Sequence, residues 1–239
     1  MIHDAASTGF SRTPDAYERG RPEYPPEAIE WLAARLGRSV LDLAAGTGKL
    51  TRPLVAAGLD VVAVEPLAEM RALLPSSVRA LEGTAEAIPL DAGSVDGVVV
   101  GQAFHWFDGD SALPEIHRVL RPGGMLAIVW NRRAPADPIG GPLDEILDPY
   151  RGAVPTHRGE AWRVPFGRTS LFSELEEETF HNEQVLDAGG MEARVGSISF
   201  IASLDPAERD KVIARARALV GEGTVVVPYV TEVLTCRRS

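Results

Sequence analysis

A glycine-rich turn between two acidic residues has the clearest chemical signature in the sequence. Asp42, Gly46 and Gly48 belong to the segment VLDLAAGTGKLT (40–51), and Glu65 closes the next apolar run, DVVAVE. A glycine turn between a strand and a helix presents backbone N–H groups to a ligand. An acidic residue about 20 positions later accepts hydrogen bonds from ribose hydroxyl groups. The spacing therefore predicts a site for a cofactor that contains a nucleoside.

The residues around this turn distinguish three classes of cofactor. A P-loop needs Gly, four residues, and then Gly-Lys followed by Ser or Thr, but Leu43 and Leu50 occupy the first and last of these positions. A dinucleotide fingerprint would have a third glycine where the sequence has Thr51. Asp42 also argues against a dinucleotide, because a carboxylate beside a pyrophosphate meets poorly screened repulsion. S-adenosylmethionine has no phosphate and carries a positive sulfonium and ammonium, so these residues favour it over NAD.

The turn belongs to an alternating pattern of apolar runs and amphipathic helices. The predicted strands are 39–44, 60–65, 78–83, 95–101 and 125–130. Other predicted elements are an irregular segment at 10–25, a helix at 26–36, a helix with a capping-box-like start at Asp205-Pro-Ala-Glu208, and a terminal strand or hairpin at 224–234. Continuous apolar runs that alternate with helices are typical of a parallel sheet covered on both faces.

The composition excludes several classes of protein. The 239 residues include 34 Asp and Glu against 24 Lys and Arg, and the net charge of −10 is unfavourable for nucleic-acid binding. Cys236 is the single cysteine, which excludes an internal disulfide and a multi-cysteine metal site. The start, MIHDAAST, has no secretory signal, and no apolar run approaches the ~20 residues of a membrane span. We therefore expect a cytoplasmic protein with no metal, membrane or nucleic-acid partner.

With these residues in place, the sequence resembles the class I S-adenosylmethionine-dependent methyltransferases over nearly its whole length. VLDLAAGTG is similar to their glycine motif, although Ala44 stands where the family usually has its first glycine. Glu65, followed by Pro66, matches the acidic residue that binds the ribose hydroxyls. The segment GTAE resembles the adenine-contacting segment, with Thr84 in place of the usual Asp. Glu86 or a backbone oxygen would then contact the adenine amino group.

Two further segments are similar to the branch of this family that contains trans-aconitate-type and other small-molecule methyltransferases. They are FSRTPDAYERGRPEYP (10–25) and GQAFHWFD (101–108). The resemblance implies a Rossmann-like three-layer α/β sandwich with a seven-stranded, mostly parallel sheet and an antiparallel last strand. It also implies an N-terminal arm that closes over S-adenosyl-L-methionine, although the arm residues could instead form a solvated leader. The predicted cofactor-binding residues are Tyr17, Arg21, Asp42, Ala44, Gly46, Gly48, Glu65, Pro66, Thr84, Ala85, Glu86 and Gln102.

The methyl acceptor is expected next to the segment that follows the strand at 95–101. His105 is either a structural histidine or a base near the acceptor, Trp106 is predicted to line the substrate, and Phe107 is read as a core aromatic. Arg132 and Arg133 leave the strand at 125–130 at the same edge of the sheet. They are either solvated or clamp a carboxylate with paired hydrogen bonds.

These observations predict one methyltransferase domain that methylates a small organic molecule, with the acceptor oxygen on a carboxylate-bearing metabolite. The alternatives are an NAD-dependent oxidoreductase and a cofactor-binding regulator without activity. The sequence does not define the substrate, the acceptor atom or the oligomeric state. The predicted parts of the domain are an arm and helix at 1–37, a cofactor-binding core at 38–131, an insertion at 132–177 that walls the substrate pocket, and a C-terminal part at 178–239.

Overall fold

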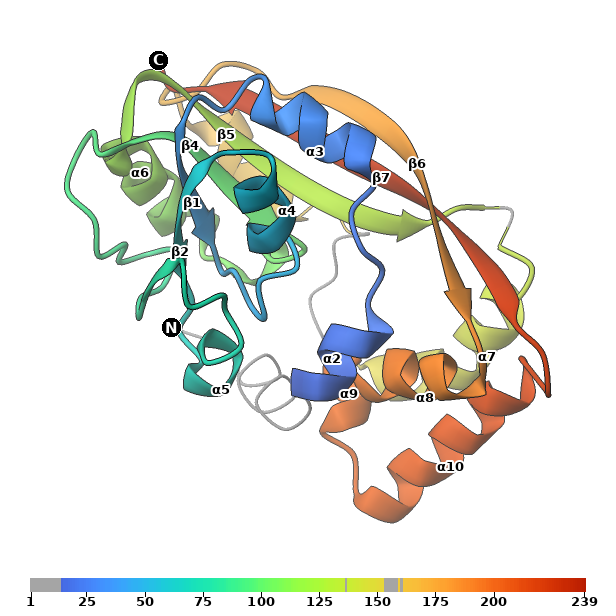
Figure 1. The fold of residues 1–239 in the computed structure, drawn as a ribbon. Coiled ribbons are helices and arrows are strands. Elements are labelled where there is room, and N and C mark those ends of the chain that lie inside the picture. Colours follow the sequence, from blue (N-terminus) through green and yellow to red (C-terminus); the bar gives the residue numbers. More distant parts are fainter. Residues whose placement is uncertain (1–13, 136, 153–158, 160) are drawn as a thin grey trace.

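Seven strands form one sheet in the order β3-β2-β1-β4-β5-β7-β6 in the computed structural model, which describes residues 14–135, 137–152, 159 and 161–239 (Figure 1). Strands β1 to β5 pair in parallel where they are neighbours, and β7 is antiparallel to both β5 and β6. The predicted fold class, a mostly parallel sheet with an antiparallel last strand, is confirmed. The strands are β1 (Ser39–Leu43), β2 (Asp60–Val64), β3 (Arg79–Leu81), β4 (Val95–Gly101), β5 (Leu120–Arg133), β6 (Glu176–Leu186) and β7 (Val225–Arg237).

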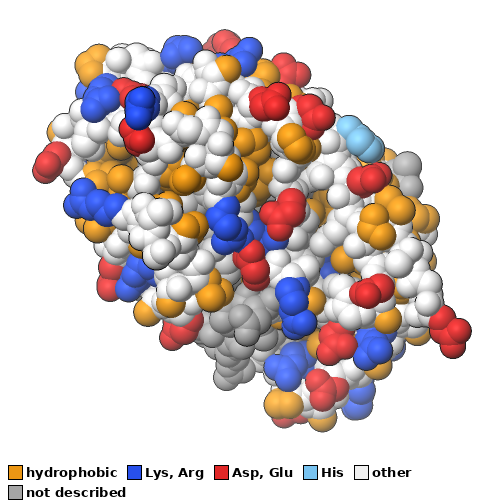
Figure 2. Space-filling model, in the orientation of Figure 1, with side chains coloured by type: hydrophobic (Ala, Val, Ile, Leu, Met, Phe, Trp, Pro, Cys, Tyr) orange, Lys and Arg blue, Asp and Glu red, His pale blue; other side chains and the backbone are white. Residues whose placement is uncertain are grey.

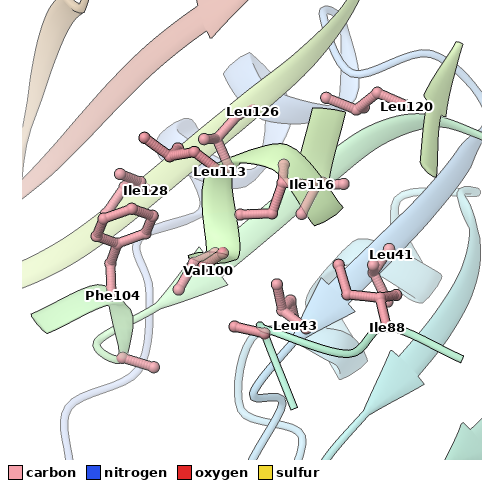
Figure 3. Packing of buried hydrophobic residues seen from close by; sticks show 14 of the residues in the cluster. Leu41, Leu43, Ile88, Val100, Phe104, Leu113, Ile116, Leu120, Leu126 and Ile128 are labelled. Carbon is pink, nitrogen blue, oxygen red and sulfur yellow. The ribbon is translucent and has the colours of Figure 1, made fainter. Parts of the chain in front are cut away.

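The central strands are apolar throughout because helices cover both of their faces. On one face, α3 (Pro26–Ala33) and α4 (Thr51–Ala56) pack on the sheet and bury Leu32 and Leu54. On the other face, α6 (Gly109–Val119) buries Leu113 and Ile116 against β5 (Figure 3). The short 3-10 helices η1 (Phe104–Trp106) and η2 (Ala161–Arg168) extend this second core with aromatic side chains. These two layers hold the carboxyl ends of the strands in place.

A third group of helices, which we name the helical lobe, packs around the ends of β6 and β7 (Figure 1). It consists of α7 (Gly140–Arg151), α8 (Ala188–Gly196), α9 (Ser199–Ala202) and α10 (Pro206–Ala218). Met191, Val195, Val212 and Tyr229 are among the side chains buried in its core. The lobe places α8 beside α2 (Pro14–Gly20), the helix of the N-terminal arm. It therefore brings residues near position 194 close to residues near position 20.

The structure corrects the prediction for the arm and for the first long helix. Residues 14–20 of the segment predicted to be irregular form α2, because this stretch packs on α8, a contact that local sequence cannot reveal. Residues 10–13, like the rest of the chain start, lie outside the described residues. The helix predicted at 26–36 ends at Ala33, followed by a turn that leads to Gly37 at φ +77°.

The capping box predicted at the start of α10 is only half formed. The carboxylate of Asp205 accepts a hydrogen bond from the Ala207 amide at 3.0 Å. Glu208 instead accepts a hydrogen bond from the Tyr150 hydroxyl at 2.6 Å, which ties α10 to α7. Within the predicted insertion at 132–177, the described residues form the end of β5, α7, η2, connecting loops and the start of β6.

Acidic and basic side chains are interspersed over the face of the molecule seen in Figure 2. This face therefore has no area of uniformly positive charge of the kind on which nucleic-acid binding depends. Within the described parts of the chain, no helix is both long enough and apolar enough to cross a membrane. One more short helix, α5 (Ala68–Arg71), follows β2 and buries Met70.

Candidate active site

The two central strands end in an unusual backbone conformation. Ala44 follows β1 at φ +60°, and Gln102 follows β4 at φ +59°. For residues with a side chain, this left-handed conformation costs about 1–2 kcal/mol. The helices after these neighbouring strands, α4 and α6, cover opposite faces of the sheet, so the strands flank a topological switch point. In open α/β sheets, ligands bind in the crevice that forms there.

A cleft that encloses about 800 Å³, including its open mouth, occupies this position. We name it the cofactor cleft. Its lining includes Tyr17, Ala44, Gly46, Glu65, Pro66, Thr84, Ala85, Glu86, Gln102 and Trp106, all predicted from the sequence as site residues. Its other lining residues were not predicted, and they are Leu43, Leu67, Met70, Gly83, Gly101, Ala103 and Phe107. Phe107, read as a core aromatic, packs against the core and also lines the cleft.

Glu65 follows β2, the strand next to β1, and fixes the glycine turn by direct hydrogen bonds. One of its carboxylate oxygens accepts a hydrogen bond from the Gly46 amide at 2.8 Å, and the other accepts one from the Leu67 amide at 2.9 Å. Its side chain is buried, and burial raises the pKa of Glu65, although the two amide hydrogen bonds and Arg71 oppose this shift. Each carboxylate oxygen can accept a second hydrogen bond, so Glu65 can bind a ligand hydroxyl pair without releasing the turn.

The two glycines of the turn have different surroundings. Gly46, at φ +59°, faces the cleft, and a side chain there would meet only Met70. Gly48, at φ +90°, does not line the cleft, and a Cβ atom there would lie 3.0 Å from Leu74 and 3.3 Å from Arg52. Gly48 therefore serves the packing of the turn against α5 and its following residues, whereas Gly46 leaves room for a ligand.

Asp42 lies beneath the cleft, and it is not among the lining residues. Its side chain is buried, and one oxygen accepts a hydrogen bond from the Thr51 hydroxyl at 2.6 Å. The other oxygen, Oδ1, is shielded from solvent and has no hydrogen-bond partner among the described residues. Burial raises the pKa of Asp42 to about 7; the Thr51 hydrogen bond opposes this and the nearby Glu65 adds to it. A buried carboxylate with an unused oxygen favours a nearby positive charge and disfavours phosphate.

The structure does not bring His105, Arg132 or Arg133 to the cofactor cleft. The His105 ring packs against the rings of Trp106 and Trp130 in tilted arrangements, with centroid distances of 4.7 and 5.4 Å. The Arg132 guanidinium donates two hydrogen bonds of 2.8 Å to Glu232 on β7.

Arg133 pairs with Asp144 on α7 and with Asp137. Both arginines therefore have their charge compensated within the protein, and neither remains a candidate carboxylate clamp on this geometry. No described residue of 132–177 lines the cleft.

The N-terminal arm is attached to both the sheet and the helical lobe. Glu23 forms an ion pair with Lys49, and its backbone oxygen accepts hydrogen bonds from Asn131 at 3.1 Å and Asn182 at 2.8 Å. Arg21 donates hydrogen bonds to the hydroxyl and the backbone oxygen of Ser197 at 3.0 and 2.8 Å. The arm thereby holds Tyr17 at the edge of the cofactor cleft.

Comparisons with known proteins agree with this geometry. Residues 41–128 match the family described as "Methyltransferase domain". An uncharacterized methyltransferase of Mycobacterium tuberculosis is 43% identical over 238 residues, which cover 94% of this chain and 93% of the relative. The solved structure of a provisionally assigned type II methyltransferase from Anaeromyxobacter dehalogenans is 24% identical and covers 91% of this chain and 97% of its own, with a TM-score of 0.64.

A third similar protein is a phosphoethanolamine N-methyltransferase of Haemonchus contortus, solved with S-adenosylhomocysteine. It is 16% identical, has a TM-score of 0.52, and the match covers 89% of this chain and 52% of that one. The fold and cleft define a class I methyltransferase architecture. The chain belongs to the S-adenosylmethionine-dependent methyltransferase family, and S-adenosylmethionine is its cofactor. The placement in the trans-aconitate-type branch stays a prediction.

The residues of the cleft fit this cofactor. The Glu65 carboxylate can accept ribose hydroxyl groups, and Leu67, Met70 and Phe107 offer apolar surface to a base. The buried negative charge of Asp42 suits a cofactor that carries a sulfonium and an ammonium in place of phosphates. This is the arrangement that the sequence predicted for S-adenosylmethionine over NAD.

Replacing Glu65 with Gln is expected to weaken the binding of S-adenosylhomocysteine about tenfold, on the scale of one hydrogen bond to a charged group. Gln keeps the shape of the side chain, but one of the two acceptor oxygens becomes an NH2 group. This NH2 group is a donor and cannot accept the hydrogen bond from a backbone N–H of the turn. Calorimetric titration of the folded variant gives the affinity, with Glu69→Gln, an exposed glutamate of α5, as the control. An unchanged affinity would remove Glu65 from the site.

Proposed function

We propose that the protein methylates a small organic molecule, and that the acceptor carries a carboxylate. The observation that carries the first part is the cofactor cleft at the switch point, with Glu65 on one wall and the buried Asp42 beneath it. The arm places Tyr17 at the cleft and packs on α8 of the helical lobe, which favours a small acceptor over a polymer. A cytoplasmic location and the absence of a nucleic-acid partner stay predictions.

The chemistry asks mainly for positioning. When bound, S-adenosylmethionine supplies a methyl group that its sulfonium already activates. The protein then has to align the acceptor with the sulfur, and alignment alone can contribute roughly 7–11 kcal/mol. Glu65 would hold the ribose, Asp42 would favour the positive charge, and Tyr17 and Trp106 would line the space between cofactor and acceptor. A carboxylate acceptor is already deprotonated, so a base such as His105 is not required.

The carboxylate part of the proposal needs a source of positive charge near the cleft. The two arginines predicted for this role, Arg132 and Arg133, are paired with Glu232 and Asp144. Other cations therefore have to bind the acceptor, and two further arginines, Arg21 and Arg194, lie beside the cleft. Methyl-transfer assays with small carboxylic acids against their matched amides test this part directly. A preference for the amides would contradict it.

Thermal unfolding tests the cofactor assignment and separates it from the oxidoreductase alternative. A ligand that binds only the folded state raises its stability by mass action, by about 2.7 kcal/mol at a hundredfold excess over Kd. For a chain of this length, S-adenosylmethionine and S-adenosylhomocysteine should raise Tm by about 5–10 °C, and NAD should leave it unchanged. A shift with NAD alone would overturn the proposal. Binding without turnover of any acceptor in a metabolite pool would favour the inactive regulator.

A further inference from the structure

A second cavity lies beside the cofactor cleft, under the arm. It encloses about 370 Å³ including its opening and shares Tyr17 and Gln102 with the cleft. Its other lining residues are Arg21, Pro22, Tyr24, Lys49, Asn131 and Arg194. They come from the arm, from the ends of β4 and β5, from the glycine turn and from α8. We name this space the arginine cavity.

The positive charges in this cavity are poorly compensated. Lys49 is paired with Glu23, but Arg21 and Arg194 form no ion pair with any carboxylate among the described residues. Arg21 donates to the uncharged Ser197, and Arg194 donates to the Tyr229 hydroxyl at 3.2 Å. Nη1 of Arg194 is shielded from solvent and has no hydrogen-bond partner within the part of the chain that the structure describes. Burial and then the Arg194 cation lower the pKa of Arg21 to about 10.

Many other arginines of the chain are not in this situation. Arg52 pairs with Glu18, Arg71 with Glu82, and Arg118 with Glu115. The high arginine content of the sequence therefore does not by itself account for two adjacent guanidinium groups without an acid. Bringing two like charges together away from water costs free energy unless an anion joins them. The cost is recovered when a ligand supplies that anion.

We propose that the arginine cavity is a carboxylate-binding subsite, in which the guanidinium groups of Arg194 and Arg21 bind one carboxylate of a ligand that reaches in from the cofactor cleft. A guanidinium can donate two parallel hydrogen bonds to a carboxylate, which suits the unused Nη1 of Arg194. Arg194 lies outside residues 41–128, the part of the chain that matches the methyltransferase family, and no sequence motif indicated it. The inference rests on the proposed function in taking the ligand to be the cofactor or its acceptor.

Two sources could supply this carboxylate: the amino-acid end of the cofactor or the methyl acceptor. The first experiment compares S-adenosylhomocysteine with its decarboxylated analogue, 5′-deoxy-5′-(3-aminopropylthio)adenosine, by calorimetry. In the second experiment the protein is first saturated with S-adenosylhomocysteine. Succinate and, separately, the neutral succinamide are then added, and their binding is measured by calorimetry. Both experiments use wild type, Arg194→Gln and the control variant Arg217→Gln. Arg217 is an exposed arginine of α10 that pairs with Glu192.

If the cofactor supplies the carboxylate, wild type should bind S-adenosylhomocysteine at least about tenfold more tightly than the analogue, and Arg194→Gln should lose that preference. If the acceptor supplies it, Arg194→Gln should keep the preference but lose succinate binding by about tenfold or more. Arg217→Gln should behave as wild type in both experiments.

The proposal is overturned if wild type shows no preference for the carboxylate-bearing ligand in either experiment. It is also overturned if Arg194→Gln folds and has the affinities of wild type in both experiments. The wild-type comparison decides even where the variant does not fold, and Arg194→Lys, which keeps the charge, provides a second variant. These binding measurements do not need turnover. A failure of the proposed function, seen as no methyl transfer, is therefore distinguishable from a failure of the subsite.

Discussion

Replacing Asp42 with Asn is expected to weaken the binding of S-adenosylmethionine at pH 8 by roughly thirtyfold, or about 2 kcal/mol, on the scale of removing one partner of a buried charge pair. Asn keeps the hydrogen bond from Thr51, whose hydroxyl donates to Asp42 at 2.6 Å. The substitution therefore removes the charge beneath the cleft and little else. A cationic cofactor favours the ionised form of Asp42, whose pKa burial raises to about 7. The affinity of wild type should thus rise with pH through about 7, and that of Asp42→Asn should not.

The same substitution should stabilise the ligand-free protein at alkaline pH. A carboxylate whose pKa is raised on folding contributes stability at low pH and loses it as pH rises from the unfolded value, near 4, to the folded value, near 7. Wild type should therefore lose stability relative to Asp42→Asn over this window. From pH 5 to pH 8, the difference in the free energy of unfolding should grow by about 2 kcal/mol in favour of the variant.

Urea unfolding at pH 5 and pH 8, with cofactor titrations at the same two values, measures both effects. Thr51→Val is a useful companion, because it removes the hydrogen bond that partly offsets the raised pKa of Asp42. Equal pH dependence in wild type and Asp42→Asn would show that Asp42 neither titrates in this window nor acts on the cofactor. The residue would then have to be treated as part of the packing of β1.

The parts of the site that the sequence predicted depend on local rules. The glycine turn needs positive φ at Gly46 and Gly48, and the apolar runs of the central strands reflect burial on both faces. Glu65 is recognisable because its distance from the turn is fixed by one strand-helix-strand unit. Of the residues predicted to bind the cofactor, Arg21, Asp42 and Gly48 do not line the cofactor cleft, and the others do.

The parts that the sequence did not predict depend on contacts between distant segments. Arg132 and Arg133 read as free cations, because nothing local shows that Glu232 and Asp144 lie beside them. Arg194 was not predicted as a site residue, because its helix has no recognisable motif. Its position beside the arm depends on the packing of the helical lobe on β6 and β7. Charge compensation is a tertiary property, so counts of Arg and Glu along the chain cannot reveal it.

Gly20 is the point where the arm meets the helical lobe, and Gly20→Ala is expected to weaken cofactor binding strongly. A Cβ atom at this position would lie 2.3 Å from the backbone carbon of Ala193 and 2.4 Å from the backbone nitrogen of Arg194. Because both are main-chain atoms, no side-chain rotation can relieve the overlap. Either α2 or α8 has to move, and overpacking of this kind costs about 1–3 kcal/mol.

A displaced α2 would carry Tyr17 and Arg21 away from their cavities, since both residues lie within one turn of Gly20. The arm would also lose the hydrogen bonds that Arg21 donates to Ser197 and that Gln184 donates to the Gly20 oxygen at 3.1 Å. We therefore expect the affinity for S-adenosylhomocysteine to fall by about 10–100-fold, the equivalent of the packing cost. Gly20 belongs to neither of the two hydrophobic clusters that hold the central strands, so the variant should still fold.

Gly141→Ala is the matched control, because Gly141 also lies in a helix, has no left-handed backbone and has no atom within 4 Å of an added Cβ. Its affinity should equal that of wild type, and its stability should equal or slightly exceed it, since alanine restricts the unfolded chain. Calorimetry and thermal unfolding of the three proteins separate the two effects. If Gly20→Ala folds and binds S-adenosylhomocysteine as wild type does, the contact between α2 and α8 does not hold the arm over the cofactor. The assignment of Tyr17 and Arg21 to the site would then have to be withdrawn.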